Sequence, residues 1–228
     1  MHKIKKSIIE RYERKFIFKN TIRNEVENLI KLNIGGFKEV YKERYINNVY
    51  FDDYLFSSFF DNVNGTARRY KYRIRWYGKF IVENKPANFE IKKKRGALTI
   101  KETFPLKKFS LKSFLKKNST SSDFNFFQSK NKLKYNFIKP VLVNRYKRKY
   151  FLSRDKLFRL TVDSDQVIGN PNNINSLRKI NNLFSPIILE IKYDRSYDKY
   201  ASKITSGLTT RLSKYSKYVN SLDCLYRF

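Results

Sequence analysis

The segment from Arg68 to Gly78 constrains the fold of this chain more than any other part of its sequence. It reads RRYKYRIRWYG, with basic and apolar residues in alternation. Because side chains on a β-strand point to its two faces in turn, the basic residues share one face. That face carries Arg69, Lys71, Arg73, Arg75 and Tyr77, and the other carries Tyr70, Tyr72, Ile74 and Trp76. Taken alone, the pattern is also typical of a strand with one solvated face.

The same alternation recurs along the chain. Three segments hold an acid and a base on one strand face: Glu13-Arg14-Lys15, Glu90-Ile91-Lys92 and Glu190-Ile191-Lys192. Other polar residues share a strand face in the same way: Thr99 with Lys101 and Thr103, Arg159 with Thr161 and Asp163, and Tyr146 with Arg148 and Tyr150. The opposite faces of most of these strands are apolar and must be buried. The repetition favours an inward polar face over a set of solvated strands.

The order of predicted elements indicates an α+β fold. Strands are expected at 7–18, 48–51, 68–78, 89–94, 97–104, 141–152, 157–163 and 187–194, and helices at 21–32, 106–117 and 198–222. Strands of this kind, without internal repeats, predict a closed antiparallel β-barrel with flanking helices, whose polar face lines the lumen. Residues 1–228 are expected to form a single domain. The Ser/Asn-rich stretch 118–132 is expected to be a flexible loop, or a lid over the barrel mouth.

The charge balance predicts a polyanionic partner. The 228 residues include 50 Lys and Arg against 20 Asp and Glu, a formal net charge of +30. AT-rich coding also favours lysine, so the position of the charges is more informative than their number. Cations packed inward without enough acids are costly, and bound phosphates remove that cost through charge-assisted hydrogen bonds. Nucleic acid, an anionic membrane or a condensed phosphate would each supply the negative charge.

Cysteine and histidine are nearly absent, which excludes several kinds of site. Cys224 is the only cysteine and His2 the only histidine. A Ser-His-Asp triad and a His or Cys zinc site are therefore excluded, and any metal must be Mg²⁺ or Mn²⁺ on oxygen ligands. The sequence has no apolar stretch of 18 residues or more, so a cytoplasmic protein without a transmembrane segment is expected. Whether its basic surface contacts a membrane is left open.

Several strings along the chain resemble the VTC domain, the polyphosphate polymerase branch of the CYTH-like triphosphate tunnel metalloenzymes. They are YERKF at Tyr12, NVYFDD at Asn48, RIRWYG at Arg73, FEIKKK at Phe89, FRLTVDSD at Phe158, ILEIKYD at Ile188 and LSKYSKYV at Leu212. The strings occur in order from about residue 8 to about residue 220. The resemblance implies a metal-dependent phosphotransferase that moves the terminal phosphoryl group of a nucleoside triphosphate, ATP, onto polyphosphate inside a triphosphate tunnel. ATP and polyphosphate are the implied partners, and DNA is not expected.

The resemblance also implies a set of site residues. Its phosphate-binding positions fall on Lys15, Arg73, Arg75, Lys92, Lys101, Arg148, Arg159 and Lys214, and strand alternation adds Lys71 and Lys192. The catalytic residues expected among them are Arg73, Arg75, Lys92, Arg148, Arg159 and Lys214. Lys214 would reach the tunnel from the final helix. Glu190 matches the family's metal-binding glutamate, and Glu13 is the second candidate ligand for Mn²⁺ or Mg²⁺. Tyr77, Tyr146 and Tyr215 are expected to serve packing.

One departure from the superfamily pattern bears on the reaction. Hydrolytic members carry acid-x-acid-x-lysine on the first strand, whereas this chain has Arg11 in place of the first acid. The change disfavours an inorganic triphosphatase, which remains one alternative. A non-catalytic protein that binds polyanions or nucleic acid is the other. Eukaryotic polymerases of the family also carry a regulatory domain and membrane helices, so control and product export are expected to need other proteins, such as a separate membrane protein.

Overall fold

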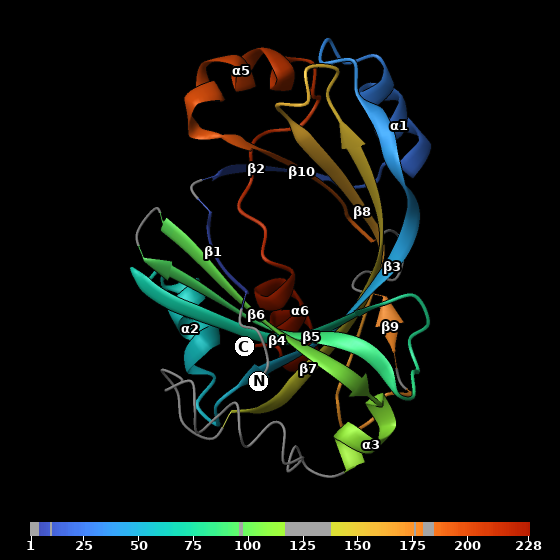
Figure 1. The fold of residues 1–228 in the computed structure, drawn as a ribbon, viewed down its shortest axis with the longest axis vertical. Coiled ribbons are helices and arrows are strands. Elements are labelled where there is room, and N and C mark those ends of the chain that lie inside the picture. The colour runs from blue at the N-terminus through green and yellow to red at the C-terminus, as the bar shows by residue number, and fades with distance from the viewer. Residues whose placement is uncertain (1–4, 10, 96–97, 117–137, 176, 180–184) are drawn as a thin grey trace.

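The computed structural model describes residues 5–9, 11–95, 98–116, 138–175, 177–179 and 185–228. The predicted loop at 118–132 lies outside these residues. Within them the chain forms one antiparallel sheet that curves around a central space, with short helices at both ends (Figure 1). The predicted α+β class is therefore confirmed.

The sheet contains ten strands within the described residues. Their bounds are β1 (Lys5–Ile9), β2 (Arg11–Phe18), β3 (Lys38–Asp52), β4 (Arg68–Tyr77), β5 (Lys85–Arg95), β6 (Leu98–Phe109), β7 (Lys139–Leu152), β8 (Arg159–Gly169), β9 (Arg178–Lys179) and β10 (Ile187–Asp194). The strand order is β1-β6-β5-β4-β3-β7-β8-β10-β2, and β9 pairs with β8 outside this path. The helices are α1 (Arg23–Lys31), α2 (Ser57–Val63), α3 (Leu111–Lys116), the 3₁₀ turn η1 (Arg195–Tyr197), α5 (Asp198–Ser206) and α6 (Lys217–Tyr226).

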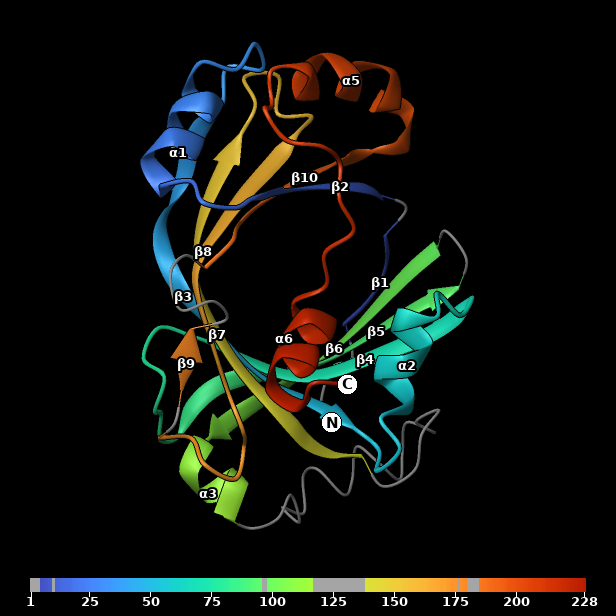
Figure 2. The ribbon, with the colours of Figure 1, turned by 180° about the vertical axis from the view of Figure 1, so that it is seen from behind.

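Within the described residues, the hydrogen-bonded strands do not close into a barrel, contrary to the prediction. The hydrogen-bonded path is open between its two edge strands, β1 and β2. These strands follow one another in the chain, and a single residue separates Ile9 from Arg11. Every neighbouring pair in this nine-strand path is antiparallel, so β1 and β2 at its two ends run in the same direction and cannot pair as antiparallel neighbours. The sheet nevertheless curves far enough to place β2 and β10 across from β4, β5 and β6, and the chain between α5 and α6 runs from one group of strands to the other (Figure 2).

The outward faces of the strands are buried in apolar clusters, as the alternation predicted. Tyr72, Ile74 and Trp76 of β4 are each 1% exposed and pack with aromatic residues of β5, β6 and α3. A second cluster packs β2, β8 and β10 against α1 and α5. A third packs α6, with α2, against β3, β7 and β8 on the inward side, where Tyr50 lies opposite Arg73. Helices α1, α3 and α5 thus cover the outward apolar surface, while α6 packs on the inward side of the sheet.

A β-bulge changes which residues of β8 face inward. The pairing of β7 with β8 shifts register between Arg145 and Lys147, and Asp165 on the other strand adopts a left-handed backbone with φ 52°. Such an extra residue reverses the alternation beyond it. As a result Asp163 and Gln166 both reach the interior, where Gln166 donates to Ser221 of α6 at 2.9 Å.

Some predicted boundaries were wrong because pairing between strands overrode local preference. The helix expected at 106–117 is shortened to α3, since β6 stays paired with β5 through Phe109. The strand expected at 48–51 begins ten residues earlier, at Lys38, because β3 pairs with β7 along almost its whole length. The helix expected at 198–222 is two helices, α5 and α6, joined by residues 207–216.

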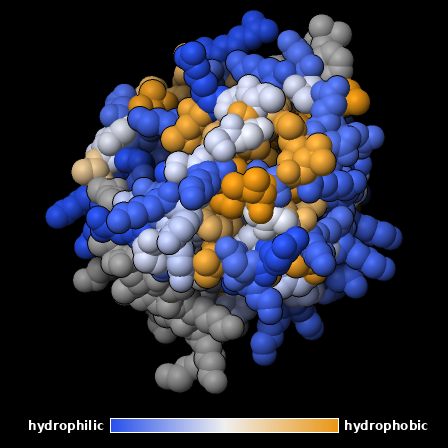
Figure 3. Space-filling view, turned by 90° about the horizontal axis from the view of Figure 1, so that it is seen from above, coloured by the Kyte–Doolittle hydropathy of each residue, from blue (hydrophilic) through white to orange (hydrophobic). Residues whose placement is uncertain are grey.

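Both hydrophilic and hydrophobic side chains lie on the surface over α1 and α5. Seen from above, apolar residues gather near the middle of this face within a largely hydrophilic border (Figure 3). The segment that follows α1 contributes exposed apolar side chains, with Leu32 84% and Ile34 75% exposed. Over the residues that the structure describes, no helix is long and apolar enough to cross a membrane.

The first testable prediction concerns the outward core of β4. Ile74 is 1% exposed and belongs to the first apolar cluster, which packs β4 with β5, β6 and α3. Replacing it by alanine leaves a cavity and should lower the free energy of unfolding by about 2–5 kcal/mol in a urea titration. Val40→Ala on β3, where the side chain is 42% exposed, is the control and should change it by less than about 1 kcal/mol. Equal effects of the two substitutions would contradict this assignment of the core.

Candidate functional site

The strand pairing brings polar residues of different strands onto one inward face. Directly opposite residues of an antiparallel pair lie on the same side of the sheet. Arg73 lies opposite Glu90, Lys71 opposite Lys92, and Lys15 opposite Glu190. Nine of the bases that the structure describes on this face make up the candidate site, namely Lys15, Lys71, Arg73, Arg75, Lys92, Lys101, Arg148, Lys192 and Lys217. Its four acids are Glu13, Glu90, Asp163 and Glu190, so these residues carry a formal excess of five positive charges.

Glu90 is the counterion for one half of this face. Its carboxylate accepts from Arg73 Nε at 2.7 Å and from Lys101 Nζ at 2.7 Å, and Arg75 lies 4.0 Å away. The Glu90 side chain is 5% exposed. Burial by itself would raise the pKa of Glu90, but the charges of Arg73, Arg75 and Lys101 hold it well below its usual value. Glu90 is therefore ionised and holds three cations in place.

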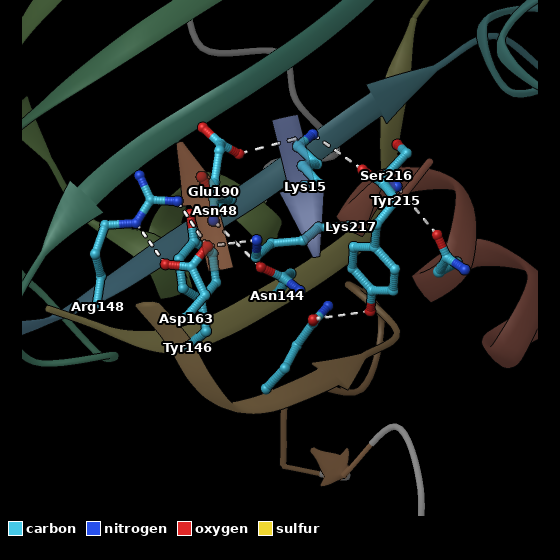
Figure 4. Close-up of polar contacts among 12 residues, drawn as sticks. Lys15, Asn48, Asn144, Tyr146, Arg148, Asp163, Glu190, Tyr215, Ser216 and Lys217 are labelled. Carbon is cyan, nitrogen blue, oxygen red and sulfur yellow. Dashed lines mark hydrogen bonds and ion pairs between the residues drawn. The ribbon is translucent and has the colours of Figure 1, made fainter. Parts of the chain in front are cut away.

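Asp163 is the counterion for the other half. Its Oδ1 accepts from Arg148 Nε at 2.5 Å and its Oδ2 from Arg148 Nη2 at 2.7 Å, and Lys217 Nζ lies 2.5 Å from Oδ2 (Figure 4). Asp163 is 1% exposed, and although burial opposes ionisation, Arg148 and Lys217 keep its pKa below the usual value. Both cations also lie over the ring of Tyr146, at 5.4 and 4.8 Å from its centroid.

Tyr146 and two asparagines fill the space between these halves. Arg75 donates to Tyr146 Oη at 3.3 Å and to Asn48 Oδ1 at 2.9 Å, and Asn48 donates to Asn144 at 3.3 Å. Burial opposes ionisation of Tyr146, yet Arg148 and Arg75 hold its pKa below the usual value. Asn144 Nδ2 and Thr161 Oγ1 are buried and have no hydrogen-bond partner in the described part of the chain. Such groups are rare and indicate a missing partner.

The two candidate metal ligands lie on paired strands and are both held by lysines. Glu13 on β2 is 2.6 Å from Lys15, 3.8 Å from Lys92 and 4.0 Å from Lys192. Glu190 on β10 contacts Lys192 and lies 3.7 Å from Lys15. No group of three or more His, Cys, Asp or Glu side chains forms a metal site within the described residues. Mg²⁺ is commonly held by one or two carboxylates together with substrate phosphates, and this pair fits that role.

The C-terminal segment lies within the curve of the sheet and completes the site. Ser213 N donates to Lys15 O at 2.8 Å, and Lys15 Nζ donates to Tyr215 O at 3.0 Å. Ser216 caps α6 by accepting from Val219 N, and its hydroxyl also accepts from Lys71 Nζ at 2.8 Å. These bonds place the first residue of α6, Lys217, at Asp163.

Asp52 anchors α6 from the other side. Tyr218 of α6 donates to its carboxylate, which also accepts the backbone N–H groups of Ser58 and Phe59 at 2.9 Å. Burial raises the pKa of Asp52 to about 6 in spite of these donors. The contact joins α6 to the start of α2 and fixes the helix that carries Lys217.

Lys71 differs from the other inward bases because its only described polar contact is neutral, the hydroxyl of Ser216. Burial, together with the charges of Lys92 and Lys15, lowers its pKa well below the usual lysine value. A negatively charged ligand beside it would reverse this effect.

Most of the site residues predicted from the sequence lie on the inward face, but two of them are exposed. Lys15, Lys71, Arg73, Arg75, Lys92, Lys101, Arg148 and Lys192 meet on the inward face together with Glu13 and Glu190. Arg159 lies opposite Lys192 in the β8–β10 register but is exposed, at the rim. Lys214 is exposed in the segment before α6, so the expectation that it extends from the final helix was wrong.

Sequence reasoning missed Lys217 and Asp163 as site residues. The string LSKYSKYV contains two Ser-Lys-Tyr steps, and nothing local distinguishes Lys214 from Lys217. Only the position at which α6 starts places the second lysine inward. The packing role expected for three tyrosines holds for Tyr215, which is 8% exposed, but not for Tyr77, which is 45% exposed. Tyr146 is buried but belongs to the polar network.

Comparison with known proteins gives the family. The sequence model of the VTC domain matches residues 6–226, nearly the whole chain. The chain belongs to the VTC domain family. The resemblance of its sequence strings to this family is thereby confirmed. When the sequence of this VTC domain was compared with the curated proteins, no match was found.

Two solved structures have a similar fold. One is described as a "putative adenylate cyclase" from Vibrio parahaemolyticus, with a TM-score of 0.51 and 11% identity over 92% of this chain and 96% of that one. The other is a "putative adenylate cyclase" from Bacillus halodurans, with a TM-score of 0.52 and 13% identity over 92% and 97%. At these identities the likeness concerns the fold alone. It supports the arrangement of strands around a central space in this VTC domain.

A second prediction tests Glu90 as a counterion. Glu90→Gln leaves Arg73, Arg75 and Lys101 without a compensating charge, and removing one partner of a buried pair costs about 3–5 kcal/mol. We expect the variant to unfold at a lower temperature in phosphate-free buffer. Because a bound polyanion would supply the missing charge, tripolyphosphate should raise its melting temperature more than that of the wild type.

Glu102→Gln is the matched control for this experiment. Glu102 pairs with Lys93 at 2.8 Å on the same two strands, but it lies opposite the outward residue Ile91. Its loss should destabilise the fold without increasing the response to tripolyphosphate. An equal gain in both variants would contradict an anion site on the inward face.

A third prediction follows from Lys71. Its lowered pKa means that it releases its proton at a lower pH than an ordinary lysine, and a bound triphosphate would raise that pKa again. Binding should therefore take up protons and weaken as the pH rises from neutral toward about 10. Calorimetry in two buffers of different ionisation enthalpy measures the uptake. Lys71→Met should reduce it and Lys19→Met, at an exposed position after β2, should not; unchanged uptake in the first variant would refute the assignment.

Proposed function

We propose that this VTC domain is a polyphosphate polymerase that transfers the terminal phosphoryl group of a nucleoside triphosphate, ATP, to a polyphosphate chain. The observation that carries the proposal is the inward face itself, where nine bases meet four acids within a curved sheet. A surface for nucleic acid would instead place such residues on an outer face. Family membership and the tunnel-like fold add to this support.

The proposed reaction requires positioning and charge neutralisation more than proton transfer. A terminal oxygen of the polyphosphate acceptor attacks the γ-phosphorus of ATP, a new P–O bond forms, and the bond to the β,γ-bridging oxygen breaks to release ADP. The attacking oxygen is already ionised at neutral pH, so no general base is needed. This requirement suits a site made of Arg and Lys with few acids, because such transfers are promoted by stabilising charge on the phosphate oxygens.

The cations that would bind phosphate are held ready by carboxylates. Arg73 and Lys101 contact Glu90, and Arg148 and Lys217 contact Asp163. Each arginine has five N–H donors, so it can bind a phosphate while it keeps its carboxylate. Arg75 lies nearest to the middle of this set because its side chain contacts Asn48 and Tyr146 and approaches Glu90. The unpartnered Nδ2 of Asn144 offers a further donor to the same space.

Glu13 and Glu190 would hold Mg²⁺ or Mn²⁺ jointly with the phosphates of ATP. Such an ion supplies positive charge to the phosphate oxygens when it is bound. The lysines now paired with these carboxylates, Lys15, Lys92 and Lys192, would then be available to phosphate. The replacement of a first-strand acid by Arg11 leaves fewer carboxylates than hydrolytic members have, which favours a polymerase over a triphosphatase.

The product made from ATP tests this function. We expect the protein, incubated with ATP and Mn²⁺ or Mg²⁺, to yield a ladder of long phosphate chains on a gel. Arg75→Ala and Glu190→Ala should each lower the rate by about 100-fold or more, the usual effect of removing one stabilising group. Arg14→Ala is the control: Arg14 pairs with Asp198 at 2.9 Å on the opposite face of β2, and its loss should leave the rate within about twofold.

Three outcomes would contradict the proposed reaction or its site. Release of orthophosphate from tripolyphosphate without chain growth would identify a triphosphatase. Tight binding of single-stranded RNA that tripolyphosphate cannot displace, with no turnover of ATP, would identify a nucleic-acid-binding protein. Full activity of both the Arg75 and the Glu190 variants would show that the chemistry occurs elsewhere.

A further inference from the structure

Three aromatic side chains and one arginine lie together where the first half of β3 meets the C-terminal ends of β4 and β7. The guanidinium carbon of Arg44 lies 4.6 Å from the ring centroid of Tyr77 and 4.8 Å from that of Tyr150. Arg44 Nε also donates to Tyr150 Oη at 3.0 Å, and the ring of Tyr41 meets that of Tyr150 edge-on at 5.8 Å. We call these four residues the aromatic group.

The strand register places the aromatic group on the inward face. Ile46 lies opposite both Tyr77 and the inward residue Tyr146, so Tyr77 points to the same side of the sheet. Arg44 lies opposite Arg148 in the same way. Tyr41 lies opposite Tyr150, and a register shift between Tyr41 and Arg44 keeps both on this face. The aromatic group therefore continues the face that carries the bases.

Its distance from the phosphate-binding residues suits a nucleoside. Tyr150 follows Arg148 by two residues along β7, a rise of about 7 Å. A triphosphate bound at Arg148 would place its ribose across this step and its base beside the tyrosines. The order along the strand, first arginine and then tyrosine, matches the order of phosphate and base in a nucleotide.

The aromatic group is accessible, unlike the aromatic residues of the apolar clusters. Tyr77 is 45% exposed and Tyr41 64% exposed, whereas Tyr72 and Trp76 on the opposite face of β4 are 1% exposed. Arg44 holds the Tyr77 ring from one side through a cation–π contact. An exposed, oriented ring of this kind stacks readily on a nucleobase, and this interaction tolerates any base because every base has a π-face.

We propose that the aromatic group binds the base of the nucleoside triphosphate, with Tyr77 as the stacking surface and Arg44 as its support. The proposal rests on the function proposed above and adds to it a site for the base. It makes this protein prefer a nucleoside triphosphate to inorganic tripolyphosphate without selecting strongly among the bases. The phosphates of both ligands are bound by the same cations, so only the nucleotide gains from the tyrosine.

Binding of ATP and of tripolyphosphate to the full chain tests the base site. Tyr77→Ala should weaken ATP binding by about 5- to 100-fold and leave tripolyphosphate binding within about twofold. Tyr77→Phe keeps the ring and should retain ATP binding. Tyr54→Ala is the matched control, because Tyr54 is also exposed and also lies under a cation, Lys139 at 3.9 Å, but outside the aromatic group.

Each other outcome overturns the inference. Equal weakening of both ligands in Tyr77→Ala would show that Tyr77 only supports the phosphate site. Unchanged ATP binding would show that the base lies elsewhere, while the proposed function stands. Failure of tripolyphosphate to bind the wild type would overturn the proposed function and this base site with it.

Discussion

The pairing of inward cations with a few buried carboxylates is the interaction on which the rest of this structure depends. Glu90 and Asp163 each hold at least two cations and are 4% and 1% exposed. Without these acids, bases from different strands would repel one another in a partly desolvated space. With them, the fold keeps an excess of positive charge on one face, and that excess supports the proposed binding of a polyanion. The same excess of cations that lowers the stability of the unliganded fold would therefore raise its affinity for the proposed polyanion.

The helices serve this face by covering the other one. Apolar side chains of α1, α3 and α5 pack on the outward surface of the sheet, so the inward surface is left for polar residues. Helix α6 differs because it lies within the curve, anchored by Tyr218 at Asp52 and by Ser221 at Gln166. The first residue of α6, Lys217, extends to Asp163 in the site. A helix that closes part of the space therefore also contributes to the site, which links the C-terminal end of the chain to ligand binding.

The inward face has two chemically different regions. The bases around Glu90 and Asp163 offer charge, and the aromatic group of Tyr41, Arg44, Tyr77 and Tyr150 offers flat rings. They are continuous because the pairing of β3 with β4 and with β7 extends through both regions. A ligand with a charged end and a planar end fits this sequence of surfaces. A polyphosphate product has only the charged part, so it would bind the first region and leave the second free.

The alternation of residue types by itself determined which face of each strand is polar. Period-two patterns depend only on backbone geometry, so the sequence alone assigns Arg73, Arg75, Lys92 and Glu190 to the polar faces of their strands. Tertiary structure decided what alternation cannot encode. The described hydrogen-bonded path stays open between β1 and β2, a bulge at Asp165 turns Gln166 inward, and the start of α6 selects Lys217 over Lys214. Each depends on contacts between segments far apart in the chain, which no local pattern records.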